Sequence, residues 1–213
     1  MDDATEPQNK RQAVWTPPLE LMCSFASQAA DAAPRERDRL VWVGAEVWPH
    51  GMHAVRSMAA RRTLLGERSL YVEAQSAHER LWAADLALRS RTSAAVIIDG
   101  RGFDLTATRR LQLVAESSGC VVMLARPSWE RQQLSAAALR WLVSWDASQA
   151  GKRRWTLELL RHKGGASLVG THRWVVERDH ERDCKAGAWR VAADLGERSG
   201  ATGDGAPRLR RFG

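Results

Sequence analysis

The stretch Ala94-Ala-Val-Ile-Ile-Asp-Gly100 decides the fold class that we predict for this chain of 213 residues. Its run of apolar residues is typical of a strand that is covered on both faces, as the strands of a parallel sheet are. Asp99 follows the run directly, where the strand would reach the edge of such a sheet. The stretch therefore predicts a buried central strand that ends in an acid.

Helix signals lie on both sides of this strand. Ser76 and Glu79 match a capping box, in which a hydroxyl and a carboxylate satisfy free backbone donors at a helix start. The helix that follows would run through Arg89. Asp104 can cap a second helix over residues 105–118. On the first helix, we expect the buried residues to be Leu81, Trp82, Ala84 and Leu88.

Further apolar strands alternate with these helices. They are predicted at residues 40–43, 69–73 and 120–124. From Leu139 onward the apolar residues alternate with polar ones, which is typical of half-exposed antiparallel strands. The fold class that we expect is therefore α/β, with a largely parallel central sheet flanked by helices and C-terminal antiparallel strands. The antiparallel strands are expected near residues 139–145, 155–159, 173–177 and 189–192.

Composition and charge limit the class of protein. The net charge of +7 and the pI near 10.1 favour an acidic partner such as nucleic acid, although an arginine-rich proteome would give the same balance. Three scattered cysteines fit a reducing compartment, and no signal peptide or membrane span is evident, so we expect a cytoplasmic protein. We predict a flexible leader at residues 1–18, one domain at 19–195 and a disordered tail at 196–213.

Six apolar segments between residues 19 and 176 resemble, in order and spacing, the strands of the RecA ATPase core. Within that superfamily, three segments resemble the ImuA family, the RecA-like accessory proteins of bacterial mutagenesis cassettes. They are His78-Glu-Arg-Leu-Trp-Ala-Ala-Asp-Leu-Ala-Leu-Arg89, Thr108-Arg-Arg-Leu-Gln-Leu-Val-Ala-Glu116 and Trp155-Thr-Leu-Glu-Leu-Leu-Arg-His-Lys-Gly-Gly165. The resemblance implies a RecA-like adaptor in damage-induced (SOS) translesion synthesis. Its implied partners are a Y-family-polymerase-like subunit, RecA and an error-prone replicative-type polymerase.

The motif that an ATPase of this kind requires is absent from the sequence. No phosphate loop G-x-x-x-x-G-K-[ST] occurs, and counting back from Glu46 places Pro17, Pro18 and Met22 where the cradle would lie. Proline lacks the backbone N–H that a phosphate nest must present. Glu46 and Asp99 match the two acids of the recombinase pattern, so we interpret them as relicts of a lost catalytic site, and the simpler role that we favour for Asp99 is to cap or turn the end of its strand. We expect no enzyme activity and no cofactor, and a residual ATPase with an unrecognised cradle is the alternative.

Candidate contacts with partners or DNA are basic and aromatic. The short loop after residue 126 places Trp129 between two arginines, which could stack on and bind a single-stranded base, or Trp129 could pack under the hairpin. The other basic residues could contact phosphates or be merely solvated, and the tail residues could form a docking peptide or have no function. The full set is Arg109, Arg110, Arg126, Trp129, Arg131, Lys152, Arg153, Arg154, Arg161, Lys163, Leu209, Arg210, Arg211 and Phe212.

Metal sites are not predicted. His50 and His53 are near each other in the sequence, as are His180 and Cys184, but neither pair comes with the further ligands that a zinc site needs. Cys23 is expected to be a small core residue rather than a nucleophile. Direct binding of single-stranded DNA is the second function that the sequence leaves open.

Overall fold

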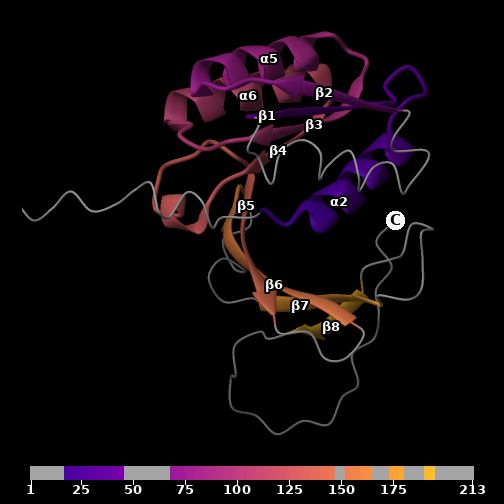
Figure 1. Cartoon of the computed structure of the whole chain (residues 1–213), viewed down its shortest axis with the longest axis vertical. Helices are drawn as coiled ribbons and strands as arrows, with labels where there is room; N and C mark the ends of the chain where they lie inside the picture. The colour runs from indigo at the N-terminus through magenta and orange to yellow at the C-terminus, as the bar shows by residue number, and fades with distance from the viewer. Residues whose placement is uncertain (1–16, 46–67, 147–151, 165–172, 180–189, 195–213) are drawn as a thin grey trace, which may run out of the picture.

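The computed structural model describes residues 17–45, 68–146, 152–164, 173–179 and 190–194, which form two four-stranded sheets (Figure 1). The first sheet has the order β2-β1-β3-β4, and all its strands are parallel. Its strands are β1 (Arg39–Gly44), β2 (Ser69–Glu73), β3 (Ser93–Asp99) and β4 (Val121–Ala125). The predicted parallel sheet is therefore confirmed, with β3 as a central strand that is buried at every position.

Helices cover both faces of the parallel sheet (Figure 1). Helix α2 (Leu19–Ala32) packs on one face, where its residues share a core with Leu40 and Trp42 of β1. Helices α5 (Ala77–Arg89) and α6 (Leu105–Ser118) pack together on the other face. Since β3 contributes to both cores, the uninterrupted apolar run in its sequence is explained.

The predicted helix starts are confirmed in atomic detail. The Ser76 hydroxyl accepts from the backbone N–H of Glu79 at 3.1 Å, and the Glu79 carboxylate accepts from the backbone N–H of Ser76 at 2.9 Å. Asp104 accepts from the N–H of Ala107 at 2.7 Å at the start of α6. Helix α6 ends at Gly119, whose φ of +67° is a left-handed conformation that favours glycine.

One expected core residue of α5 is exposed. Trp82 is 61% exposed, whereas Ala84 and Leu88 are fully buried as expected. The inward face of the helix is formed by Arg80, Ala83, Ala84 and Leu88, and Trp82 points away from it because each residue turns the helix by about 100°. The prediction for Trp82 was wrong because the buried face contains an arginine, which the apolar pattern cannot reveal.

The second sheet is antiparallel and has the order β5-β6-β7-β8. Its strands are β5 (Leu139–Asp146), β6 (Lys152–His162), β7 (Arg173–Asp179) and β8 (Arg190–Asp194). The one-turn helix η1 (Ser128–Glu130) lies between β4 and β5. The predicted antiparallel strands are thus confirmed, with the last one beginning at Arg190.

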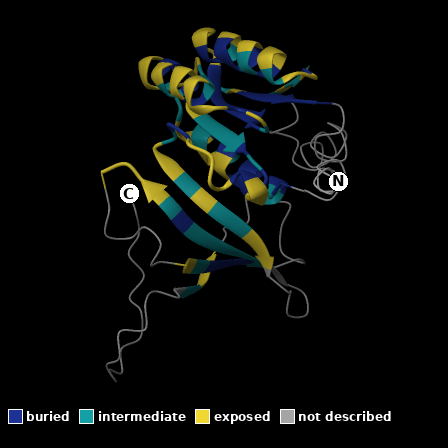
Figure 2. Cartoon of the chain, turned by 90° about the vertical axis from the view of Figure 1, so that its left-hand side faces the viewer, coloured by how far each residue is buried: buried dark blue, intermediate teal, exposed yellow. Residues whose placement is uncertain are grey.

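One face of the antiparallel sheet is aromatic. Trp141, Val143 and Trp145 of β5 lie opposite Leu159, Leu157 and Trp155 of β6. Trp145 and Trp155 form an edge-to-face pair with ring centroids 4.8 Å apart, and Trp141 pairs in the same manner with Trp174 of β7 at 5.4 Å. Figure 2 shows that these long strands are exposed or half-buried over much of their length, while the central parallel strands β1 and β3 are largely buried.

Two sequence predictions concern membranes and termini. None of the helices in the described part of the chain combines the length and the apolar character that crossing a bilayer requires. Most of the predicted leader and the whole predicted tail, with Leu209, Arg210, Arg211 and Phe212, lie outside the described residues.

Candidate functional site

The carboxyl edge of the parallel sheet is the place where open α/β sheets bind their ligands. In this chain Asp99 ends β3 at that edge, and its side chain is fully buried. Arg101 encloses the carboxylate: its Nη2 lies 2.6 Å from Oδ2, its Nε lies 2.9 Å from Oδ1, and its backbone N–H also donates to Oδ1 at 3.2 Å. Both carboxylate oxygens of Asp99 are therefore bound by the guanidinium group of Arg101. This group occupies the position to which the carboxylate would otherwise attract a metal ion.

Arg80 fills the neighbouring position at the same edge. It lies on α5, is only 5% exposed, and donates to three backbone carbonyls rather than to a carboxylate. Its Nε donates to Asp99 at 2.9 Å, its Nη1 to Gln75 at 2.7 Å and its Nη2 to Arg101 at 2.9 Å. Burial lowers the pKa of Arg80, while the charge of Asp99 acts in the opposite direction. Arg80 thus ties the ends of β2 and β3 together.

Arg126 and Glu130 form a second buried ion pair, beside Asp99. Arg126 follows β4, and its Nε lies 2.9 Å from Oε2 of Glu130, with the two side chains 12% and 9% exposed. Glu130 also accepts from the backbone N–H of Gly102 at 3.0 Å, which connects η1 to the loop after β3. A Cβ on Gly100 would lie 3.2 Å from Cγ of Arg126, so the arginine stem crosses the end of β3 closely.

Two further arginines reach this region from the β5–β6 hairpin. Arg140 and Arg161 lie directly opposite each other on the two antiparallel strands. Nη2 of Arg140 donates to the backbone carbonyl of Arg131 at 2.8 Å, and Nη1 of Arg161 donates to that of Ser135. Burial lowers the pKa of Arg140, and the positive charges of Arg126 and Arg161 lower it further. Like charges at directly opposed positions destabilise a sheet, so the stability of the hairpin does not explain why Arg140 faces Arg161.

The segment that would have to carry a phosphate cradle forms part of the core instead. Pro17 and Pro18 lead into α2, whose N–H groups at Leu19 and Met22 donate to the proline carbonyls. Met22 is buried in the core beside β1, and Ser24 is buried as well. Of the two predicted relict acids, Asp99 is described above, and Glu46 lies outside the described residues.

The structure brings some predicted contact residues together. Arg126, Trp129 and Arg131 belong to one loop, in which Trp129 is 43% exposed, and Arg161 reaches the same loop from β6. Arg154 lies near the opposite end of β6, where it pairs with Glu177 at 3.0 Å. Lys152 and Arg153, next to Arg154 on β6, also belong to that end.

The predicted basic residues of α6 lie on its surface. Arg109 donates to Gln112 at 2.8 Å, and Arg110 pairs with the buried Asp85 of α5 at 3.1 Å. Lys163 lies 3.8 Å from Glu116 of α6, and both side chains are more than half exposed. These residues therefore do not form one continuous patch with Arg154.

Sequence reasoning missed four residues of this edge: Arg80, Arg101, Glu130 and Arg140. Arg80 and Glu130 are buried ions within polar stretches, and nothing in their spacing distinguishes them from solvated residues. Arg101 lies two residues after the strand-end acid, which was a usable signal, because such an arginine can fold back onto the carboxylate. Arg140 could have been paired with Arg161 only after the register of the hairpin was known.

Cysteine and metal predictions can be compared with the described residues. Cys23 and Cys120 are buried and form no disulfide bond, and burial raises the pKa of Cys120 to about 11. Over the described ranges, no three His, Cys, Asp or Glu side chains gather as metal ligands would. His50, His53, His180 and Cys184 lie outside those ranges.

Comparison with protein-family models and with curated proteins finds no match for this chain.

Proposed function

We propose that this chain is a non-catalytic, RecA-like adaptor of the ImuA type that acts in damage-induced translesion synthesis by binding other proteins. The observation that carries the non-catalytic part is the ion pair of Asp99 with Arg101. In an ATPase core the strand-end acid has to orient a metal ion. Here both carboxylate oxygens are bound by the chain's own guanidinium, and Arg80 fills the adjoining edge.

The order of elements supports the RecA-like part of the proposal. The six segments on which the resemblance rests are all strands, with β1 to β4 in the parallel sheet and β5 and β6 in the antiparallel one. The replacement of a phosphate cradle by two prolines and the buried Met22 agrees with an ancestral motor that has lost its nucleotide site.

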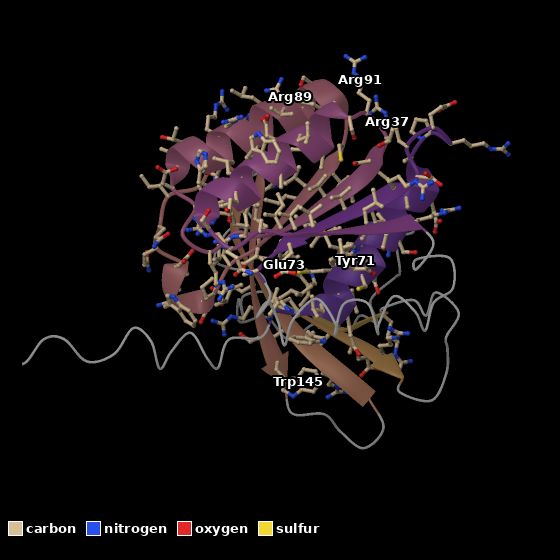
Figure 3. All side chains as sticks on the ribbon, turned by 45° about the horizontal axis from the view of Figure 1, so that its top comes forward. Arg37, Tyr71, Glu73, Arg89, Arg91 and Trp145 are labelled. Atoms are coloured by element: carbon tan, nitrogen blue, oxygen red, sulfur yellow. The ribbon has the colours of Figure 1, made fainter. Side chains whose placement is uncertain are left out.

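An adaptor needs a surface, and the aromatic face of the antiparallel sheet supplies one. Trp141 is 42% exposed and Trp145 is 54% exposed, on the same face of the same edge strand (Figure 3 labels Trp145). Tryptophan is enriched among the residues that dominate binding energy at protein interfaces. We therefore assign the contact with the Y-family-polymerase-like partner to this face, and RecA and the replicative-type polymerase complete the proposed set of partners.

The proposal is tested by measuring binding to the purified Y-family-polymerase-like subunit with biolayer interferometry. We expect submicromolar binding by the full chain and a loss of more than about tenfold in the double variant Trp141→Ala/Trp145→Ala. Trp82→Ala is the matched control, because Trp82 is even more exposed, at 61%, but lies on α5. Full affinity in the double variant would remove the assigned face, and no binding by the full chain at micromolar concentration would count against the adaptor itself.

A nucleotide experiment separates the adaptor from a residual ATPase. A ligand that binds only the folded state raises the melting temperature, and the rise grows with the logarithm of the ligand concentration divided by its Kd. We expect magnesium ATP to produce no rise in Tm that depends on Asp99, so the response of Asp99→Asn should equal that of the unmodified chain within about 1 °C. A rise that Asp99→Asn abolishes, together with hydrolysis, would establish the alternative function.

A further inference from the structure

Three guanidinium groups converge on one short loop at the carboxyl edge of the parallel sheet. Nη2 of Arg126 donates to Oε1 of Gln133, while Arg140 and Arg161 donate to the backbone carbonyls of Arg131 and Ser135. The three arginines come from three elements: the end of β4, strand β5 and strand β6. We call Arg126, Arg140 and Arg161 the arginine triad.

The charge balance of the triad differs from that of the other arginine pairs described in this chain. Arg89 and Arg110 share the carboxylate of Asp85. Arg154 and Arg190 likewise share Glu177. Each of these pairs thus has an acid between its members.

Arg140 and Arg161, by contrast, donate only to backbone carbonyls among the interactions of the described residues. Among the described residues, the acid that pairs with the triad is Glu130, which is bound by Arg126 and by the N–H of Gly102. The charges that shift the pKa of Arg140 are Arg126 and Arg161, and both are positive. The triad therefore has an uncompensated positive charge that an anion would neutralise.

We propose that the arginine triad is a binding site for a phosphate group. Guanidinium groups bind phosphate through two parallel N–H donors, and several of them can share one anion. Arg161 is exposed and Arg140 is half-buried, so these two contact the ligand. Arg126 lies behind them with 12% of its side chain exposed, and its Nη1 has no hydrogen-bond partner in the described structure. Because Arg126 is largely buried, its positive charge attracts the phosphate more strongly than it would in water.

The phosphate can belong to a small phosphate ester or to the backbone of single-stranded DNA. Trp129 lies in the same loop and is 43% exposed, which allows it to stack on a base that is attached to the bound phosphate. The site does not depend on the proposed adaptor function, because the aromatic face of the antiparallel sheet is formed by other residues.

The first experiment uses inorganic phosphate as the probe and melting temperature as the readout. At about 20 mM phosphate, we expect the Tm of the full chain to rise by about 3 °C or more over chloride at equal ionic strength. Arg161→Gln, at an exposed position where folding is tolerant, should lose most of that rise. Arg89→Gln is the control. Figure 3 labels Glu73, which ends β2 and so marks the carboxyl edge where the triad lies, and Arg89 lies at the opposite end of the parallel sheet.

The second experiment identifies the source of the phosphate. Anisotropy of a labelled oligothymidine measures binding of single-stranded DNA, and each lost phosphate contact should reduce the salt slope by about 0.7. If DNA is the ligand, Arg161→Gln and Trp129→Ala both weaken binding by about tenfold, and only Arg161→Gln affects the phosphate-dependent Tm. If oligothymidine does not bind while the Tm rise remains, the ligand is a small phosphate ester. An equal Tm rise in Arg161→Gln and the unmodified chain, or none in either, would overturn the site.

Discussion

The parallel sheet and the antiparallel sheet bury their strands to different extents. Strand β3 of the parallel sheet is buried at all seven positions between Ser93 and Asp99, because helices cover both of its faces. Strand β6, a central strand of the antiparallel sheet, is buried only at Leu159 among residues 154–162, and its neighbour β5 leaves Leu139, Trp141 and Trp145 between 42% and 54% exposed. Both sheets are rich in apolar side chains, so the difference arises from what covers them rather than from composition.

The difference in burial indicates that the two sheets have different roles in the molecule. The central strands β1 and β3 of the parallel sheet are closed off from water, and ions lie at the strand ends, where Arg80, Arg101 and Asp99 satisfy one another and the backbone. The antiparallel sheet keeps aromatic side chains accessible, and it carries Arg140 and Arg161 to the edge of the parallel one. We infer that the first sheet maintains the fold and that the second provides most of the binding surface.

The comparison is tested most strongly by removing the same side chain from each sheet. Leu40 of β1 is fully buried, and Leu157 of β6 is half-buried. We expect Leu40→Ala to lower the free energy of unfolding by about 3–4 kcal/mol, because it leaves a cavity in a closed core. Leu157→Ala should cost about 1–2 kcal/mol, since less area leaves water when it folds. Equal losses in urea denaturation would contradict the distinction between the sheets.

Prediction from sequence succeeded where a local pattern has a single physical cause. The apolar run before Asp99, the capping box at Ser76 and the two-residue alternation after Leu139 each identified their element correctly. Trp82 was placed in the core wrongly, because the inward face of α5 contains Arg80, whose partners are carbonyls of distant loops. Periodicity treats such an arginine as a solvated residue.

The candidate site was predicted only in part. Arg126, Trp129, Arg131 and Arg161 were named from the sequence, but their convergence on one loop depends on contacts across 26 residues, as between Arg161 and Ser135. Asp99 was interpreted as a relict acid, which stays a prediction, and the ion pair with Arg101 was not predicted from the sequence pattern. Long-range pairing of this kind leaves no periodic signal in a single sequence.

A second prediction concerns the ionic edge that closes the parallel sheet. Arg80→Ala should lower the free energy of unfolding by about 2–3 kcal/mol, because it leaves the carbonyls of Gln75, Asp99 and Arg101 without their donor. Arg89→Ala is the matched control on the same helix. Arg89 is 61% exposed, so solvent screens its ion pair with Asp85, and Arg89→Ala should change the free energy of unfolding far less than Arg80→Ala. If both variants melt alike, Arg80 does not tie the strand ends together.

The smallest expected effect is the pH dependence of the cap of α5, the helix that carries Arg80. Hydrogen bonds from the backbone and hydroxyl of Ser76 and from the backbone of Gln75 lower the pKa of Glu79 from its usual 4.5. Since the folded pKa is the lower one, the stabilisation is fully present above pH 4.5 and is lost as the pH falls through the folded value. Glu79→Gln should therefore flatten the decrease of Tm between about pH 5 and pH 3. Glu116→Gln, at an exposed carboxylate of α6, is the control and should leave that decrease unchanged. If the Tm of the Glu79 variant falls with pH as steeply as that of the unmodified chain, the capping box does not contribute to the acid sensitivity of the fold.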